Sequence, residues 1–457
     1  MPTRRKFLRS TSTLGFAGSL GGLTALQLGY VRQASAATFS DYKALVCVLL
    51  AGGNDSYNML VPTSNGQYNQ YQQLRSDLAL PQLDLLPLAG SHNGETYGVH
   101  PGMPQVQQMY DAGDLAFIAN VGPLVDHVDK VAVEAGIGIP LGVFSHADQI
   151  QTWQTAVPND RIAQGWGGRM ADVLQDANLA NGISMNISLS GTNVFQSGAS
   201  VTPYSIQATD QGAAGVNAYD DGTEFGAFRK RMVDDLLAVS RDNLLRREYT
   251  QRLRGAIDAN ALFVDALASA PVLTTAFSEG PFSQALRQIA RVIGARSQLG
   301  AVRQTFFVTV GGWDHHDEVL DNQAGMLPAI SAGLSEFRDA LNELGVFADV
   351  TTFTTSDFGR TLTSNGRGSD HGWGGNHMVM GGSVNGGQFF GQYPELSGVS
   401  PLDVGRGVLI PTTSVDEYFT DLALWYGLAP ADLDRVLPNV RTFYSPESGV
   451  PALGLMS

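Results

Sequence analysis

Carboxylates and imidazoles follow three apolar segments of the chain, at the point where each segment ends. "ALVCVLLAGGND" leads to Asp55, "TFFVTVGGWDHHDE" leads to Asp314 and His316, and "TTFTTSDFGR" leads to Asp357 and Arg360. Glycine pairs before Asp55 and Asp314 permit a sharp exit from a strand and a close approach of the backbone. The repeated placement of oxygen and nitrogen donors favours one shared site.

A glycine-rich stretch returns with further donors. "TSNGRGSDHGWGGNHMVMGG" contains Asp370 and His371, and four of the eight histidines of the chain occupy positions 315, 316, 371 and 377. Carboxylates gathered at one edge of a sheet repel each other, and a divalent cation removes that cost. Mixed aspartate and histidine donors suit zinc or a similar metal, whereas sites made only of oxygen suit calcium or magnesium.

Ser145 and His146 open a helix-like segment, "SHADQIQTWQTA". A helix N-terminus stabilises negative charge, and a cation lowers the pKa of a nearby hydroxyl, so Ser145 is a candidate nucleophile. Serine is equally a preferred N-cap residue, which gives the same hydroxyl a purely structural role. His146 is a candidate metal ligand or proton donor.

Each of these residues has a simpler interpretation when taken alone. Asp55 can stabilise a turn, Asp314 can cap the following segment, and Asp357 can pair with Arg360. His371 can pack in its loop. Their joint occurrence at strand exits is what favours a functional site.

The elements between these residues alternate in type, which is typical of an α/β fold with a central, mostly parallel sheet flanked by helices on both faces. We expect strands over residues 43–55, 115–122, 181–191, 304–314, 348–360 and 377–382. We expect helices over 101–114, 146–156, 327–345 and 415–428, and a helical insert at about 225–300. Ligands bind beyond the carboxyl ends of the strands in such sheets, so the polar clusters are expected to meet there.

Charge and composition exclude several classes of partner. The chain has 28 basic and 43 acidic residues, and five of the basic ones lie in the first 36 positions, which leaves a net charge of −20 beyond them. Such an acidic surface disfavours nucleic acid and anionic lipid. Cys47, the one cysteine, lies in an apolar run and is expected to be buried.

The N-terminus predicts export. "TRRKFLR" is followed by a weakly apolar, glycine-containing stretch and "ASA", the pattern of a twin-arginine signal peptide cleaved near Ala36. We therefore expect residues 1–36 to engage the twin-arginine export machinery and residues 37–457 to form a single periplasmic or secreted domain. No later segment has 18 uncharged apolar residues, so no stable membrane insertion is expected.

The order of these motifs resembles a bacterial family known as domain of unknown function 1501, whose members usually carry a twin-arginine signal. The resemblance covers about residues 3–428. That family is similar to the alkaline phosphatase and sulfatase superfamily. The resemblance implies an alkaline-phosphatase-like α/β fold with metal ions at the carboxyl edge of the sheet, and hydrolysis or transfer of phosphate, sulfate or phosphonate esters.

The resemblance also implies roles for individual residues. Ser145 matches the nucleophile, and Arg360 could hold an oxygen of the bound anion. Phe358 occupies the place of a histidine in the second metal site of the superfamily, so that site could be absent or could recruit His146 or His377. The residues implied as metal ligands are Asp55, Asp314, His316, Asp357 and His371.

The leading hypothesis is an exported, metal-dependent hydrolase of a small phosphate or sulfate ester that binds one or two divalent ions, with zinc the expected metal. The alternative is a non-catalytic periplasmic or cell-surface binding protein that keeps the scaffold, which Phe358 favours. A metal-independent serine esterase is disfavoured because the chain lacks a G-x-S-x-G elbow.

Overall fold

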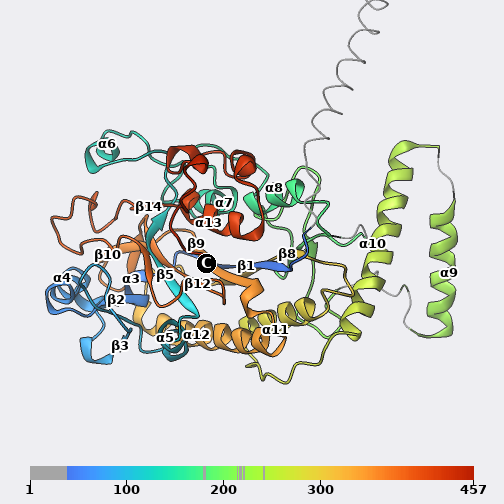
Figure 1. Ribbon diagram of the computed structural model, residues 1–457, viewed down its shortest axis with the longest axis horizontal. Coiled ribbons are helices and arrows are strands. Elements are labelled where there is room, and N and C mark those ends of the chain that lie inside the picture. Colours follow the sequence, from blue (N-terminus) through green and yellow to red (C-terminus); the bar gives the residue numbers. More distant parts are fainter. Residues whose placement is uncertain (1–38, 179–181, 214, 216–218, 220–221, 240–241) are drawn as a thin grey trace, which may run out of the picture. The chain divides into compact units, whose positions relative to one another are not determined.

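The computed structural model describes residues 39–178, 182–213, 215, 219, 222–239 and 242–457. Within these, residues from Asp41 to Ser457 form one compact unit (Figure 1). The predicted signal peptide, residues 1–36, lies outside the described residues. None of the described helices is both long and apolar enough to cross a membrane.

The central sheet is built around β1 (Lys43–Ala51), which pairs in parallel with β8 (Arg303–Gly311) and β9 (Val350–Ser356). In the described part of the chain the sheet has nine strands in the order β13-β5-β12-β9-β1-β8-β6-β7, with β14 also paired to β5. Only β12 (Gly375–Met380) runs antiparallel to its described neighbours, β9 and β5 (Leu115–Gly122). The predicted mostly parallel sheet is therefore confirmed.

Shorter strands complete the sheet and form two small satellites. The remaining members of the main sheet are β6 (Asn186–Ser188), β7 (Tyr204–Ser205), β13 (Phe389–Gly391) and β14 (Thr413–Ser414). One satellite pairs β2 (Leu60–Pro62), β4 (Tyr97–Val99) and β3 (Leu86–Pro87). The other pairs β10 (Arg360–Ser364) with β11 (Ser369–His371) and carries part of the site described below.

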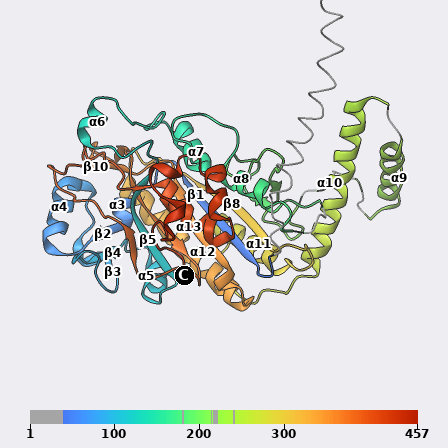
Figure 2. The same cartoon turned by 45° about the horizontal axis from the view of Figure 1, so that its top comes forward.

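Helices cover both faces of the sheet, as the sequence predicts (Figures 1 and 2). One face packs against α5 (Pro104–Asp111), α11 (Pro281–Gly294) and α12 (Val319–Glu343). The other packs against α7 (His146–Thr155), α8 (Trp166–Val173) and α13 (Val415–Tyr426). Seven of the nine residues of β1 are buried because both of its faces are covered.

Short helices occupy the connections between these layers. They are α3 (Ser56–Met59), α4 (Asn65–Arg75), α6 (Lys130–Glu134) and α14 (Leu433–Val436). The helical segment expected at about 225–300 consists of α9 (Glu224–Ala238), α10 (Leu244–Ala268) and α11. Of these three, α11 packs against α12 and contributes its apolar face to the core under the sheet.

One helix starts earlier than its sequence pattern suggests. The pattern places the start of α12 at Leu327, where Pro328 would sit in the first turn, but the helix begins at Val319 and Pro328 lies inside it. The ring of Pro328 packs against Gly102, where a Cβ would lie 2.9 Å from the proline Cγ. A proline inside a helix removes one backbone hydrogen bond, which is why the start at Val319 is not expected from the sequence.

Candidate metal centre

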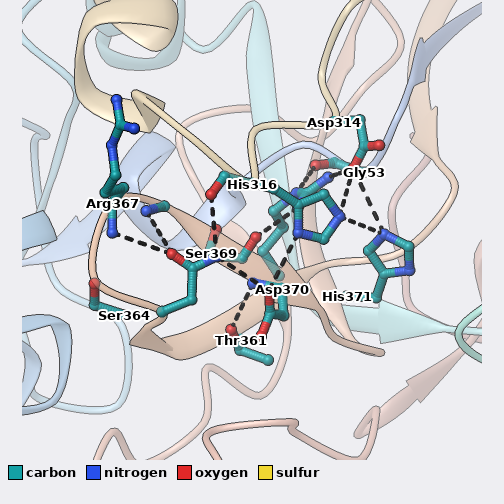
Figure 3. Close-up of polar contacts among 12 residues, drawn as sticks. Gly53, Asp314, His316, Thr361, Ser364, Arg367, Ser369, Asp370 and His371 are labelled. Carbon is teal, nitrogen blue, oxygen red and sulfur yellow. Dashed lines mark hydrogen bonds and ion pairs between the residues drawn. The ribbon is translucent and has the colours of Figure 1, made fainter.

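Three separate parts of the chain meet beyond the carboxyl end of β8. Asp314 and His316 follow β8, His146 is the first residue of α7, and His371 is the last residue of β11 (Figure 3). One donor atom from each of His146, Asp314 and His371 lies within 4.8 Å of the others. Since β1, β8 and β9 are parallel and in register, their exits lie along one edge, as the strand-end pattern predicts.

The carboxylate of Asp314 lies at the centre of three imidazoles. Its Oδ1 atom is 3.1 Å from Nε2 of His316 and 3.5 Å from Nε2 of His371, and its Oδ2 atom is 3.4 Å from Nε2 of His146. The Nε2 atoms of His316 and His371 are 2.9 Å apart. Donor atoms around a tetrahedral zinc ion lie about 3.3 Å from each other. The donor atoms of His146, Asp314 and His371 are therefore close enough to share one ion, and His316 lies beside Asp314 and His371.

The other nitrogen of each of these histidines, Nδ1, faces a hydrogen-bond acceptor. The distances are 2.6 Å from His146 to Oδ2 of Asp357, 3.2 Å from His316 to Oδ1 of Asp370 and 2.8 Å from His371 to the Phe144 carbonyl. An Nδ1–H group that donates to such an acceptor leaves a lone pair on Nε2, the arrangement typical of metal-bound histidine. Nε2 of His146 is buried and has no hydrogen-bond partner in the described part of the chain, so it is available to a cation.

The electrostatic environment favours the ionisation states that a metal ligand needs. Burial alone would raise the pKa of Asp314, but the hydrogen bond and positive charge of Arg360 lower it below its usual range. The pKa of His371 is lowered mainly by burial. Burial would also raise the pKa of Asp370, yet hydrogen bonds from Asn365, Arg406 and His316 bring it to about 2. At neutral pH the carboxylates are ionised and His371 is neutral.

Phe358 forms a wall of this centre. Its ring centroid lies 4.9 Å from that of His146 and 4.5 Å from that of His371, and the residue is buried. Gly53 passes against this ring, since a Cβ at position 53 would lie 2.5 Å from Cε2 of Phe358. The aromatic residue at the position of the expected histidine thus packs against the imidazoles of His146 and His371.

Asp55 is not one of the converging donors. Its buried carboxylate accepts hydrogen bonds at Oδ2 from Arg75 at 2.6 Å and from the Ser369 hydroxyl at 2.9 Å. Arg75 is fully buried at the end of α4, so the pair is an internal ion pair. The expected ligand Asp55 is instead used to neutralise Arg75, and no feature of the sequence indicates this partner.

Asp357 and Arg360 each contact one residue of the centre, His146 and Asp314 respectively. Asp357, an expected ligand, is fully buried and accepts hydrogen bonds from His146 and from the Gly52 amide, at 2.9 Å, and it is not one of the converging donors. Arg360 is 1% exposed and donates to the carbonyls of Gly52, Gly53 and Ser369 and to Asp314. This guanidinium therefore holds Asp314 and the end of β1, and its expected contact with a bound anion stays a prediction.

Ser145 has the structural role that its position suggests and also adjoins the centre. It is the N-cap of α7, and its Oγ accepts a hydrogen bond from the Asp148 amide at 3.4 Å. The residues on either side of it, Phe144 and His146, both contact the centre. His377, in contrast, is buried beside Trp153, where burial lowers its pKa to about 3, and it does not join the group.

Two groups that accept hydrogen bonds from the imidazoles were not predicted in that role from the sequence. These are the Asp370 carboxylate and the Phe144 carbonyl. Asp370 precedes His371 in the chain and was noted as a donor, but its contact with His316 depends on the β10-β11 hairpin. A backbone carbonyl leaves no signal in a sequence.

The sequence matches the family described as "Protein of unknown function (DUF1501)" over residues 42–429. The chain belongs to this family. The predicted resemblance is thereby confirmed over most of the length of this DUF1501 protein. No curated protein matches its sequence.

Solved structures align with this DUF1501 protein at low identity. They include the integral membrane protein lipooligosaccharide phosphoethanolamine transferase A from Neisseria meningitidis, with 11% identity over 98% of this chain and 67% of the transferase, at a TM-score of 0.37. A 2-O GAG sulfatase aligns at 9% identity over 76% of this chain and 65% of its own, at a TM-score of 0.28. A mutant of the alkaline phosphatase PafA aligns at 12% identity over 71% of this chain and 64% of the phosphatase, at a TM-score of 0.26.

Proposed function

We propose that this DUF1501 protein is an exported metal-dependent hydrolase of small phosphate or sulfate esters. The observation that carries the proposal is the set of three imidazoles, each fixed at Nδ1 by an acceptor, that present Nε2 to Asp314. The metal ligands in this proposal are His146, Asp314, His316 and His371. A single zinc ion is the expected occupant because the donors are imidazole nitrogens and a carboxylate oxygen.

A divalent cation at this position supplies Lewis acidity toward an oxygen of an anionic ester. Asp314 and the three imidazoles bring only one formal negative charge to the centre, so it keeps a net positive charge when a divalent cation is bound. This local charge offsets the acidic surface of the chain and favours an anionic substrate.

Ser145 is the proposed nucleophile. Its Oγ lies at the N-terminus of the ten-residue helix α7, where amide N–H groups and the helix dipole stabilise negative charge on an oxygen. Oγ would attack the phosphorus or sulfur atom of the ester and release the alcohol. Water would then cleave the resulting serine ester, release phosphate or sulfate and restore the hydroxyl. His146 is proposed as a ligand and not as a proton donor, because both of its ring nitrogens face carboxylates.

The proposal is tested with the purified full chain after equilibration with zinc. Aryl phosphate, phosphodiester and aryl sulfate substrates are assayed beside zinc content for the wild-type chain, Ser145→Ala and His371→Ala. The expected result is turnover by the wild type, zinc without turnover for Ser145→Ala, and loss of both for His371→Ala. Turnover that persists in chelator-treated protein would contradict a metal-dependent mechanism.

The alternative function is a periplasmic or cell-surface binding protein that keeps the metal centre without catalysis. The observation that favours it is the enclosure of Arg360, whose donors are used by backbone carbonyls and Asp314. Stoichiometric zinc in the wild-type chain with no turnover on any of the three ester classes would select this alternative.

A further inference from the structure

Two halves of one helix differ sharply in burial. The second half of α10 places Phe263, Ala266 and Leu267 in the main hydrophobic core. The first half instead exposes Leu244, Leu245 and Tyr249 by 65%, 78% and 69%. α9 lies beside this first half in both views (Figures 1 and 2). The hairpin of α9 and the start of α10 therefore presents apolar side chains to solvent.

α9 carries an apolar stripe along its length. Its members are between 48% and 64% exposed, and they recur at spacings of three and four residues: Phe225, Phe228, Met232, Leu236 and, just past the helix end, Val239. Together with Val233 and Leu237, which line the adjoining groove, the stripe makes one apolar side of α9 of the kind that packs against another helix. The stripe therefore indicates a helical partner.

The hairpin is held rigid from behind the stripe. Asp234 of α9 forms an ion pair with Arg254 of α10 and accepts a hydrogen bond from the Tyr219 hydroxyl at 2.6 Å. On the exposed side the rings of Phe225 and Phe228 stack with centroids 6.4 Å apart. A preorganised aromatic pair loses little conformational entropy on binding, which is typical of the centre of an interface.

An apolar groove runs between the two helices beside the stripe. It has a volume of about 610 Å³ and is lined mainly by aliphatic and aromatic side chains, among them Val233, Leu237, Leu245, Tyr249 and Leu253. Side chains of a partner helix can enter such a groove as knobs enter holes. The hairpin thus offers both a ridge and a groove for helix packing.

We propose that a second copy of this chain packs on the hairpin, so that two hairpins form a four-helix interface around a two-fold axis. The eight exposed apolar side chains offer roughly 100 Å² each, about 800 Å² in total, which is what each partner buries in a standard stable interface. Arg231 and Asp235 are exposed beside the stripe and carry opposite charges. In a two-fold dimer, Arg231 of one copy can pair with Asp235 of the other, whereas binding to an anionic membrane would favour basic residues alone.

The test measures the mass of the full chain in solution by light scattering over a range of concentrations. The expected result is a dimer for the wild type, and at least 100-fold weaker dimerisation for Met232→Glu, which places a charge in the middle of the stripe. Leu83→Glu is the matched control, because Leu83 is 97% exposed and lies outside the hairpin, in the 3-10 helix Gln82–Asp84. It should dimerise as the wild type does.

A cysteine variant tests the geometry independently. The native Cys47 is 3% exposed and buried in β1, so Met232→Cys introduces a single accessible thiol. Oxidation should link Met232→Cys into covalent dimers and leave Leu83→Cys monomeric. A monomeric wild type at micromolar concentration would overturn the proposal, as would a dimer that Met232→Glu leaves intact. Binding of a monomeric wild type to anionic phospholipid vesicles, lost in Met232→Glu, would overturn it in favour of a membrane partner. None of these outcomes depends on the proposed catalytic function.

Discussion

Removal of the Asp357 carboxylate tests whether Asp357 orients His146 or binds the metal ion itself. Asp357 accepts the Nδ1–H of His146 at 2.6 Å and the Gly52 amide at 2.9 Å. Loss of such a supporting partner typically weakens metal affinity 10- to 100-fold, or about 1.4–2.7 kcal/mol. Asp357→Ala should therefore still bind zinc, but with an affinity reduced by that factor. The Gly52 amide loses its acceptor, so the free energy of unfolding should also fall by about 1–3 kcal/mol.

The assay is a competition titration of the full chain against a chelator of known zinc affinity, with thermal unfolding followed in parallel. Asp432→Ala is the matched control, because Asp432 pairs with Arg435 on the surface at 2.9 Å and should leave zinc affinity within about twofold. A folded Asp357→Ala with wild-type affinity would refute the proposed orienting role. Complete loss of zinc from the folded variant would make Asp357 a direct ligand and would equally refute the reasoning.

Three further predictions concern the surroundings of the centre. Asp55→Ala leaves the buried guanidinium of Arg75 without a counter-ion, so the free energy of unfolding measured with urea should fall by about 3–5 kcal/mol. Zinc should still bind to the folded variant. A folded variant that binds no zinc would indicate that Asp55 is a ligand. The lysine of Arg360→Lys cannot span three carbonyls and Asp314 at once, so zinc affinity should fall by about tenfold or more while inhibition by free phosphate is unchanged. Unchanged zinc affinity with weaker inhibition by phosphate would instead place the Arg360 guanidinium on the substrate. Burial raises the pKa of Asp416 from 3.8 to about 7, so the native state retains a proton that the unfolded chain releases, and stability falls as the pH rises between these values. Asp416→Asn should therefore raise Tm at pH of about 8 and change it little at pH of about 4, and an equal shift at both would contradict the assigned pKa.

The part of the centre that the sequence predicted follows from the geometry of parallel strands. Asp314 and His316 follow β8, and parallel strands in register bring such positions to one edge, whereas His371 reaches this edge through the antiparallel β10-β11 hairpin. His146 was a candidate because it opens a helix after a serine cap. Residue type and position were sufficient to expect these four near one another, and their role as metal ligands stays a prediction.

The part that the sequence could not predict depends on the local partner of each polar group. Asp55 and Asp357 are both buried carboxylates at strand exits, yet one pairs with Arg75 and the other with His146. Which partner lies nearest depends on the path of α4 and α7, and neither path is encoded near the aspartate. Arg360 has the residue type of an anion-binding group, but the close passage of the Gly52–Gly53 turn uses its donors.

The fold was predictable to a similar degree and for a similar reason. Runs of apolar and β-branched residues identified β1, β5, β8 and β9, most of whose residues are buried. The antiparallel direction of β12 and the β10-β11 hairpin could not be read from these runs, since pairing direction depends on the intervening loop. The start of α12 was misplaced because proline is normally found in the first turn of a helix, whereas Pro328 lies inside this one.

The most direct test of the metal centre is the zinc content of the full chain after dialysis against zinc and then against buffer alone, measured by mass spectrometry. One zinc ion per chain is expected for the wild type, with X-ray absorption showing imidazole nitrogens in its coordination sphere. His146→Ala combined with His371→Ala should retain less than a tenth of that zinc while remaining folded. A wild-type chain that retains no zinc, or a double variant that retains all of it, would contradict a metal centre formed by His146, Asp314, His316 and His371.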